Sequence, residues 1–129
     1  NNILGNESMK YFADKILTAL STSSISSFDF SNCQIYDFGL IYVMHELQFN
    51  NKIKSINFRG NYFSTEIDNI LLKYIENNTS LLKFDLENNR IGFQCQRKIK
   101  NIILNNNIKE NRKKIFDKEM FNVISNDKI

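Results

Sequence analysis

Few residues in this 129-residue chain have both the type and the spacing that chemistry requires. Two carboxylates, Asp29 and Asp85, are candidates for acid–base work. One histidine, His45, and two cysteines, Cys33 and Cys95, are the candidate ligands of a metal ion. Whether any of them can act together depends on the elements of structure that carry them.

The histidine and the cysteines lack a recognisable ligand pattern. Zinc sites use closely spaced pairs of ligands, whereas these two cysteines are far apart and there is no second histidine for a dyad. The glycines are scattered along the chain instead of gathering into a phosphate-binding loop. The sequence therefore predicts no catalytic residue, no metal site and no cofactor, and it places His45 on a solvated helix surface.

Apolar residues follow one spacing three times. The pattern L-x-x-L-x-L-x-x-(N/C)-x-L begins at Ile25, at Ile53 and at Leu81, so that each copy is displaced from the last by 28 residues. A fixed period of this length is typical of a leucine-rich repeat solenoid, in which every repeat adds one strand and one helix to a stacked core.

Each copy changes its period along its length. Alternating apolar residues such as Phe28 and Phe30 indicate a half-buried strand, and three- and four-residue steps after them indicate an amphipathic helix. Asn-rich stretches at 50–51, 77–79 and 105–107 are the expected helix ends, because Asn tolerates the left-handed conformation. We predict an α/β leucine-rich repeat solenoid with short parallel strands on the concave face, helices on the convex face and a C-terminal capping helix.

The repeats also divide the chain. We expect a partial first repeat at 1–24, full repeats at 25–52, 53–80 and 81–108, and a basic amphipathic segment at 109–129. That last segment either caps the final repeat or docks onto a partner, with Arg112, Lys113 and Lys114 steering it to an acidic surface. Because the chain begins inside a repeat and without methionine, we expect it to be the C-terminal part of a longer protein.

Two segments resemble one subfamily of these repeats. Residues 4–14, LGNESMKYFAD, are similar to the helical part of ribonuclease-inhibitor-type leucine-rich repeats, and residues 27–35, SFDFSNCQI, resemble their strand and turn. The family includes ribonuclease inhibitor, innate immune sensors, the Ran GTPase-activating protein, axonemal subunits and tropomodulin. Residues 88–92, 102–107 and 112–114 are similar to the closing repeat of tropomodulin-like and axonemal members.

Polar side chains alternate with the buried ones and are expected to form ladders across the strands. We call this surface the strand face. Its ladders are Ser27, Ser55 and Lys83, then Asp29, Asn57 and Asp85, then Ser31, Arg59 and Glu87. With parallel strands about 4.8 Å apart, Arg59 can reach Glu87, and also Asp29 or Asp85. The strand face is either a weak exposed ion-pair network or a site for basic and polar groups of a partner protein.

Strand spacing also decides whether the two carboxylates or the two cysteines can react together. Asp29 and Asp85 are two strands apart, roughly 9–10 Å, on an open surface that does little to shift a carboxyl pKa, so acid–base catalysis is not expected. Cys33 and Cys95 are separated by more than the roughly 7 Å that a disulfide tolerates, which predicts two free thiols. Cys33, Asn61 and Asn89 share one inward position with a structural role, where Asn can bond to the backbone.

Composition narrows the partners. Seventeen basic and fourteen acidic residues leave a net charge of +3, which does not point to nucleic acid, and no apolar run approaches the roughly 20 residues that span a bilayer. We expect no membrane and no small-molecule ligand, and a cytoplasmic location. The leading hypothesis is a non-enzymatic protein-interaction scaffold of a cytoskeletal or axonemal kind. The alternatives are a regulator of a small GTPase and a ligand sensor or inhibitor that uses the concave face.

Overall fold

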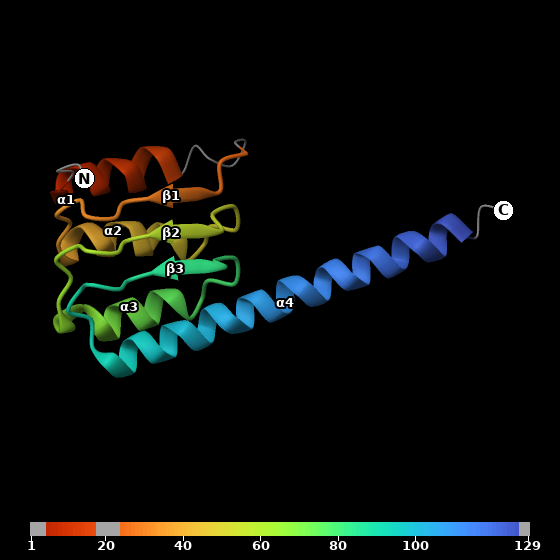
Figure 1. The fold of residues 1–129 in the computed structure, drawn as a ribbon. Helices are drawn as coiled ribbons and strands as arrows, with labels where there is room; N and C mark the ends of the chain where they lie inside the picture. Colours follow the sequence, from red (N-terminus) through yellow and green to blue (C-terminus); the bar gives the residue numbers. More distant parts are fainter. Residues whose placement is uncertain (1–4, 18–23, 127–129) are drawn as a thin grey trace.

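The computed structural model describes residues 5–17 and 24–126 of the chain, and residues 1–4, 18–23 and 127–129 lie outside it. The ends of the predicted first repeat and of the predicted tail fall among these residues. The elements form stacked turns of strand and helix (Figure 1). In order they are α1 (Gly5–Tyr11), the π-helical turn η1 (Phe12–Leu17), β1 (Ser27–Asp29), α2 (Asp37–Leu47), β2 (Ser55–Asn57), the 3-10 turn η3 (Thr65–Ile67), α3 (Asp68–Ile75), β3 (Lys83–Asp85) and α4 (Phe93–Asn126).

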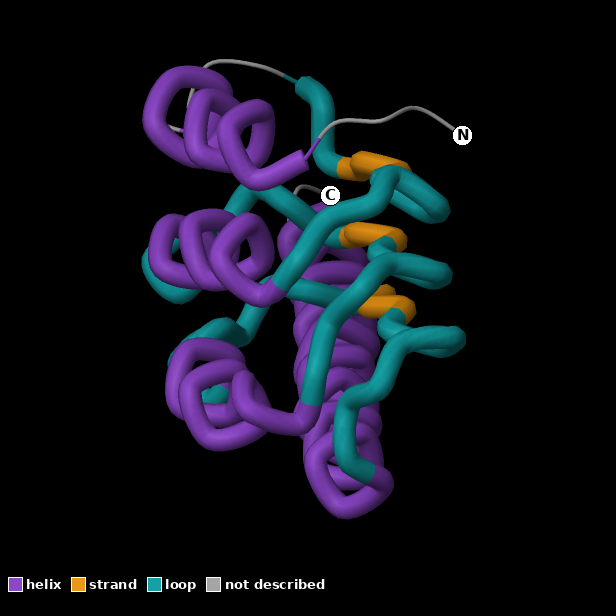
Figure 2. Tube along the Cα trace, turned by 90° about the vertical axis from the view of Figure 1, so that its left-hand side faces the viewer, coloured by secondary structure: helices purple, strands orange, loops and turns teal. Residues whose placement is uncertain are grey.

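The three strands form one parallel sheet in the order β1-β2-β3. Ser27 pairs with Ser55 and Ser55 with Lys83, so the register of the sheet repeats the 28-residue spacing of the sequence. Strands line one side of the molecule and the helices α1, α2 and α3 line the other (Figure 2). The predicted α/β leucine-rich repeat fold is confirmed.

The core lies between the strands and the helices. The apolar face of α2 is fully buried, and every alternate strand residue points inward to meet it. Phenylalanine rings run through the stack, with centroids 4.9 Å apart for Phe12 and Phe30, 5.7 Å for Phe30 and Phe58, and 6.1 Å for Phe58 and Phe84. This aromatic contact links η1 to all three repeats, so neighbouring turns stabilise one another.

Asn61 joins two repeats through its buried side chain. Its Oδ1 accepts hydrogen bonds from the backbone amides of Cys33 (3.1 Å) and Ile35 (3.0 Å) in the preceding repeat. Its Nδ2 donates to the carbonyls of Phe30 (2.9 Å) and Phe58 (2.8 Å). One side chain thus satisfies four backbone groups that the turn would otherwise leave unpaired.

Asn89 repeats part of this arrangement one turn later. Its Oδ1 accepts from the amide of Phe63 at 3.2 Å, and its Nδ2 donates to the carbonyls of Phe58 and Leu86, each at 3.0 Å. Cys33 holds the same position in the first repeat, where its thiol is buried among apolar side chains. The inward position therefore contains either an amide that bonds to neighbouring backbone or a small buried thiol.

A second asparagine ladder lies at the opposite end of the strands, where each helix returns to the sheet. Asn50, Asn78 and Asn106 are 28 residues apart, and the last two are buried. Asn78 accepts the amide of Leu81 at 2.8 Å and donates to the carbonyl of Leu47 at 2.8 Å. Two asparagine ladders therefore brace the solenoid, one at each end of the strands.

Helix α4 does not end at residues 105–107, where an end was predicted. It continues to Asn126 because these asparagines remain helical and use their side chains elsewhere. Asn106 donates to the carbonyls of Asn78 (3.2 Å) and Leu81 (3.0 Å), and Asn107 donates to the carbonyl of Leu82 (2.9 Å). The first half of α4 is thus the cap of the last repeat.

The carbonyl of Leu82 shows how this cap works. One repeat earlier, the carbonyl of Lys54 accepts the backbone amides of Leu82 (2.7 Å) and Lys83 (3.0 Å). At the end of the stack the side chain of Asn107 supplies the donor instead. An amide side chain on the capping helix therefore replaces a backbone donor of a further repeat.

Two apolar positions differ from their expected burial. Ile25 is 52% exposed, whereas its counterparts Ile53 and Leu81 are fully buried, because Ile25 precedes the strand at the outer edge of the sheet. Ile70 follows the three- and four-residue spacing of the apolar residues of α3, which predicts burial, yet it is 43% exposed.

Replacing Asn61 with alanine is expected to lower the free energy of unfolding by about 2–4 kcal/mol, since four buried backbone groups lose their partner. Urea denaturation followed by circular dichroism measures this change. The matched control is Asn101→Ala, an exposed position on α4, which should shift stability by less than about 0.5 kcal/mol. Equal effects of the two substitutions would contradict the bracing role of Asn61.

Candidate functional site

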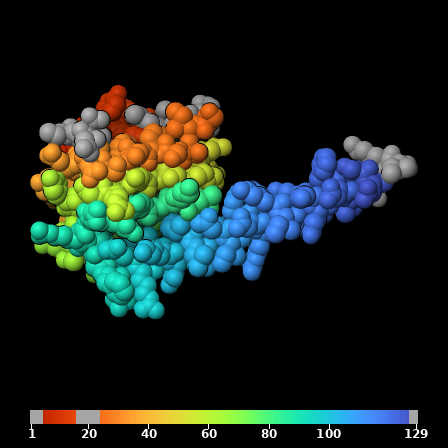
Figure 3. All heavy atoms as spheres, in the orientation of Figure 1, coloured from red at the N-terminus to blue at the C-terminus, as the bar shows by residue number. Residues whose placement is uncertain are grey.

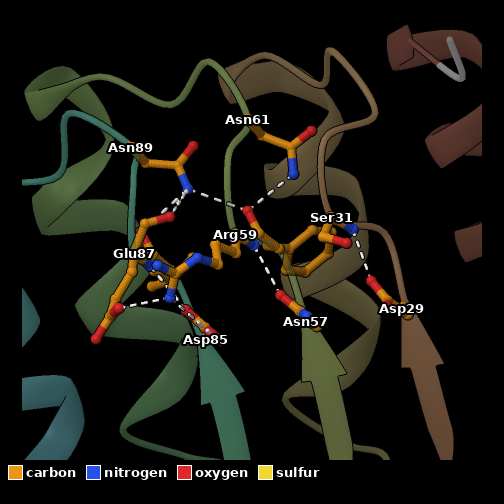
Figure 4. A network of polar contacts seen from close by, with 10 residues as sticks. Asp29, Ser31, Asn57, Arg59, Asn61, Asp85, Glu87 and Asn89 are labelled. Carbon is orange, nitrogen blue, oxygen red and sulfur yellow. Dashed lines mark hydrogen bonds and ion pairs between the residues drawn. The ribbon is translucent and has the colours of Figure 1, made fainter. Parts of the chain in front are cut away.

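The strand face begins with a repeated turn at the end of each strand. Asp29 Oδ1 accepts the amide of Ser31, Asn57 Oδ1 accepts the amide of Arg59, and Asp85 Oδ1 accepts the amide of Glu87, each at 2.9 Å. Figure 4 shows these three bonds side by side. The central ladder therefore fixes the backbone that presents the next residue of the strand face.

Arg59 connects two strands through an ion pair. Its Nη1 lies 2.6 Å from Glu87 Oε2 and 3.8 Å from Asp85 Oδ2, and all three side chains are between 39% and 52% exposed (Figure 4). Among the described residues, Arg59 makes no ion pair with Asp29. An exposed network of this kind contributes less than about 1 kcal/mol to stability, so its three charges remain available to a partner.

Asp29 and Asp85 have no geometry for shared proton transfer. The Ser31 hydroxyl and its backbone amide lower the pKa of Asp29 below its ordinary value of 3.8, which keeps this carboxylate charged. A general acid at neutral pH needs the opposite shift. Asp29 is therefore a fixed negative charge on the strand face, suited to recognition.

The sulfur and imidazole groups stand apart from the strand face. Cys33 and Cys95 are both buried free thiols, and burial, with Asp68 nearby, raises the pKa of Cys95 to about 11. His45 lies beside Glu46 at 3.4 Å on the exposed surface of α2. Across residues 5–17 and 24–126, no group of three or more His, Cys, Asp or Glu side chains is placed to hold a metal ion.

A regulator that stimulates GTP hydrolysis would need an exposed arginine or asparagine at the rim, and Arg59, Arg90 and Asn61 are the residues of these types to compare. Asn61 is 5% exposed and its amide bonds to backbone carbonyls, so it cannot take this role. Arg59 is 45% exposed but would have to leave its ion pair with Glu87. Arg90 is exposed at the rim of the third repeat and makes no ion pair among the described residues, so it meets the requirement most directly.

The basic residues of the tail lie away from the strand face. Arg112, Lys113 and Lys114 belong to the second half of α4, in which every residue from 111 to 126 is exposed. This half, residues 109–126, projects beyond the stacked repeats (Figure 3), and we call it the projecting helix. It continues the cap without covering the repeats, so the predicted binding residues form two separate surfaces.

The structure also contains a rim pocket that the repeat pattern did not reveal. Tyr36 and Tyr62 place their rings 5.0 Å apart, and both are more than half exposed. Together with Arg90 they line a pocket of about 600 Å³. Tyr62 and Arg90 are one repeat apart, but Tyr36 is out of register with them, so the spacing gave no signal for this group.

Three parallel strands in 28-residue register, helices on the opposite side and asparagine ladders between turns define a leucine-rich repeat solenoid. No protein-family model matches the chain, and no curated protein sequence matches it. Along the parts of the chain with a described structure, no helix has the length and apolar character needed to cross a bilayer.

Solved structures share this fold over most of the chain. A structure of leiomodin-1 actin-binding site 2 matches with a TM-score of 0.56 at 17% sequence identity, over 89% of this chain and 81% of that one. The C-terminal domain of tropomodulin from Caenorhabditis elegans matches with a TM-score of 0.54 at 11% identity, over 87% of this chain and 86% of that one. The resemblance of the closing repeat to tropomodulin-like proteins thus extends to the whole fold.

The pKa of Asp29 should rise toward 3.8 in a Ser31→Ala variant, which removes the hydroxyl and keeps the backbone amide. Because the folded-state pKa lies below that of the unfolded chain, this contact stabilises the protein above about pH 4, and the stabilisation is lost as the pH falls through the folded-state pKa. Carboxyl NMR titration measures the shift. Ser27→Ala is the control, and an unchanged pKa in Ser31→Ala would contradict the assigned cause.

Proposed function

We propose that this chain is a non-enzymatic, actin-associated binding domain. It would be the C-terminal leucine-rich repeat part of a larger cytoplasmic protein of the cytoskeleton. The observation that carries the proposal is the structural match to leiomodin-1 actin-binding site 2, which covers 89% of the chain.

The projecting helix supports a binding role on physical grounds. Its exposed apolar residues recur at three- and four-residue steps, with Ile115 58%, Phe116 61%, Met120 43% and Val123 53% exposed. Most of the stability of helices in proteins comes from packing of their apolar face, and this stripe is exposed to water. A partner that buries this stripe would stabilise the helix and gain apolar contact area at the same time.

The projecting helix and the strand face differ in charge, so each suits a different part of a partner's surface. The projecting helix carries Arg112, Lys113 and Lys114 beside its apolar stripe, which suits an acidic surface. The strand face carries Asp29, Asp85 and Glu87 against the two cations of Arg59 and Lys83. Its full set of proposed contacts is Asp29, Ser31, Ser55, Asn57, Arg59, Lys83, Asp85 and Glu87. One partner with mixed charge can use both surfaces, and we propose actin as that partner.

Two sets of substitutions test the proposal against actin. The first combines Arg59→Glu with Asp85→Lys, which keeps the net charge but reverses two charges of the strand face and replaces the attraction between residues 59 and 87 with repulsion. The second combines Arg112→Glu, Lys113→Glu and Lys114→Glu on the projecting helix. We expect each set to weaken binding to monomeric actin about tenfold or more in thermophoresis, because complementary charges become repulsive.

The matched control is Lys73→Glu, an exposed charge reversal on α3, which should leave the affinity unchanged. Binding that resists both sets would overturn the assignment of these surfaces. If the unmodified chain has no affinity for actin monomers or filaments, actin is the wrong partner. Stimulated GTP hydrolysis that is lost in Arg90→Ala would favour the GTPase-regulator alternative.

A further inference from the structure

A groove separates the last strand from the capping helix. It has a volume of about 270 Å³ and opens beside the strand face, next to the edge of the sheet. Its walls are formed by Lys83, Phe84, Asp85, Leu86 and Glu87 on one side and by Gln96, Ile99 and Lys100 of α4 on the other. The groove therefore lies where the strand of a fourth repeat would add to the sheet.

The backbone of β3 directs half of its polar groups into this groove. Three residues bond to the second repeat through their backbone. The amide of Lys83 donates to the carbonyl of Lys54, and the carbonyls of Asp85 and Glu87 accept hydrogen bonds from amides of the second repeat. Backbone groups alternate in direction along a strand, so those of Phe84 and Leu86 point to the opposite side. That side is the open edge.

Earlier repeats show what these edge groups normally do. The amide of Phe58 donates to Asp85 at 2.8 Å, and the amide of Gly60 donates to Glu87 at 3.0 Å. The corresponding amides one repeat later belong to Leu86 and Asn88, and neither has an acceptor among the described residues. At the edge of the sheet, the side chains of Asn106 and Asn107 donate to the carbonyls of Leu81 and Leu82, which precede β3, so α4 caps this end of the edge and leaves the other end open.

We propose that an extended segment of a partner protein adds to β3 as a fourth parallel strand in this groove. Its carbonyls would accept the amides of Leu86 and Asn88, and its alternate apolar side chains would pack against Phe84, Leu86 and Ile99. The added strand would share the side chains of Lys83, Asp85 and Glu87 with the strand face. The amides of Leu86 and Asn88 are not among the contacts assigned to actin, so their protection tests this site separately from the proposed function.

The charged side chains beside the groove favour one kind of extended segment. Outward residues of the added strand lie opposite Lys83, Asp85 and Glu87, so an acidic residue followed by two basic residues at alternate positions is favoured. A second copy of β3 in the same parallel register would instead set each of these charges against its equal. The favoured occupant is therefore a segment whose charge pattern is opposite to that of β3.

A synthetic peptide provides the probe. It consists of residues 80–90 with Lys83→Glu, Asp85→Lys and Glu87→Lys, so that it has the repeat pattern and the complementary charges. When it is added to the full chain labelled with ¹⁵N, we expect solvent exchange of the Leu86 and Asn88 amides to slow at least tenfold, because each gains an acceptor. A peptide that also carries Phe84→Asp and Leu86→Asp is the control and should have no effect.

A variant of the protein tests the place of binding. Lys100→Trp fills the groove from α4 and should weaken peptide binding at least tenfold, whereas Asn101→Trp, on the exposed side of the same helical turn, should not. Circular dichroism checks that both variants keep the fold. Unchanged exchange at Leu86 and Asn88, equal binding by the two variants, or protection that appears through self-association without peptide would each overturn the proposal. Because actin takes no part in this experiment, its result and that of the actin assay are independent.

Discussion

Every turn of this solenoid buries backbone groups that only a neighbouring turn can satisfy. The strands are three residues long, so the sheet bonds alone leave the flanking amides and carbonyls to other partners. Asparagine side chains supply them, with Asn61 at one end of the strands and Asn78 at the other. The same distance between turns places the phenylalanine rings of neighbouring repeats in contact.

The need to satisfy backbone groups also explains why some residues of the strand face have two roles. Asn57 and Asp85 hold the turn that follows their strands, and they also stand among the exposed polar side chains that a partner meets. Arg59 is held against Glu87 before any partner arrives. A surface whose side chains are already fixed by the fold loses less conformational entropy when it binds.

Spacing in the sequence predicted the register of the sheet, the inward asparagine position and the reach of Arg59 to Glu87, because each follows from a period of 28 residues. The sequence-based prediction failed at asparagines that can either end a helix or remain within it. Residues 105–107 look like a helix end by composition, yet Asn106 and Asn107 stay helical because their side chains find carbonyls of the last repeat. The rim pocket around Tyr36 and the groove beside β3 were also missed, since both depend on residues from different registers or on the loss of a repeat.

Helix α4 couples two parts of the molecule mechanically. One continuous helix of 34 residues is anchored to the last repeat at one end, and its free portion extends roughly 30 Å from the anchor. A load applied near Asn126 acts as it would on a lever and is concentrated at the bonds from Asn106 and Asn107. Tension on a bound partner would thus reach the stacked repeats through the third one, where the helix is anchored.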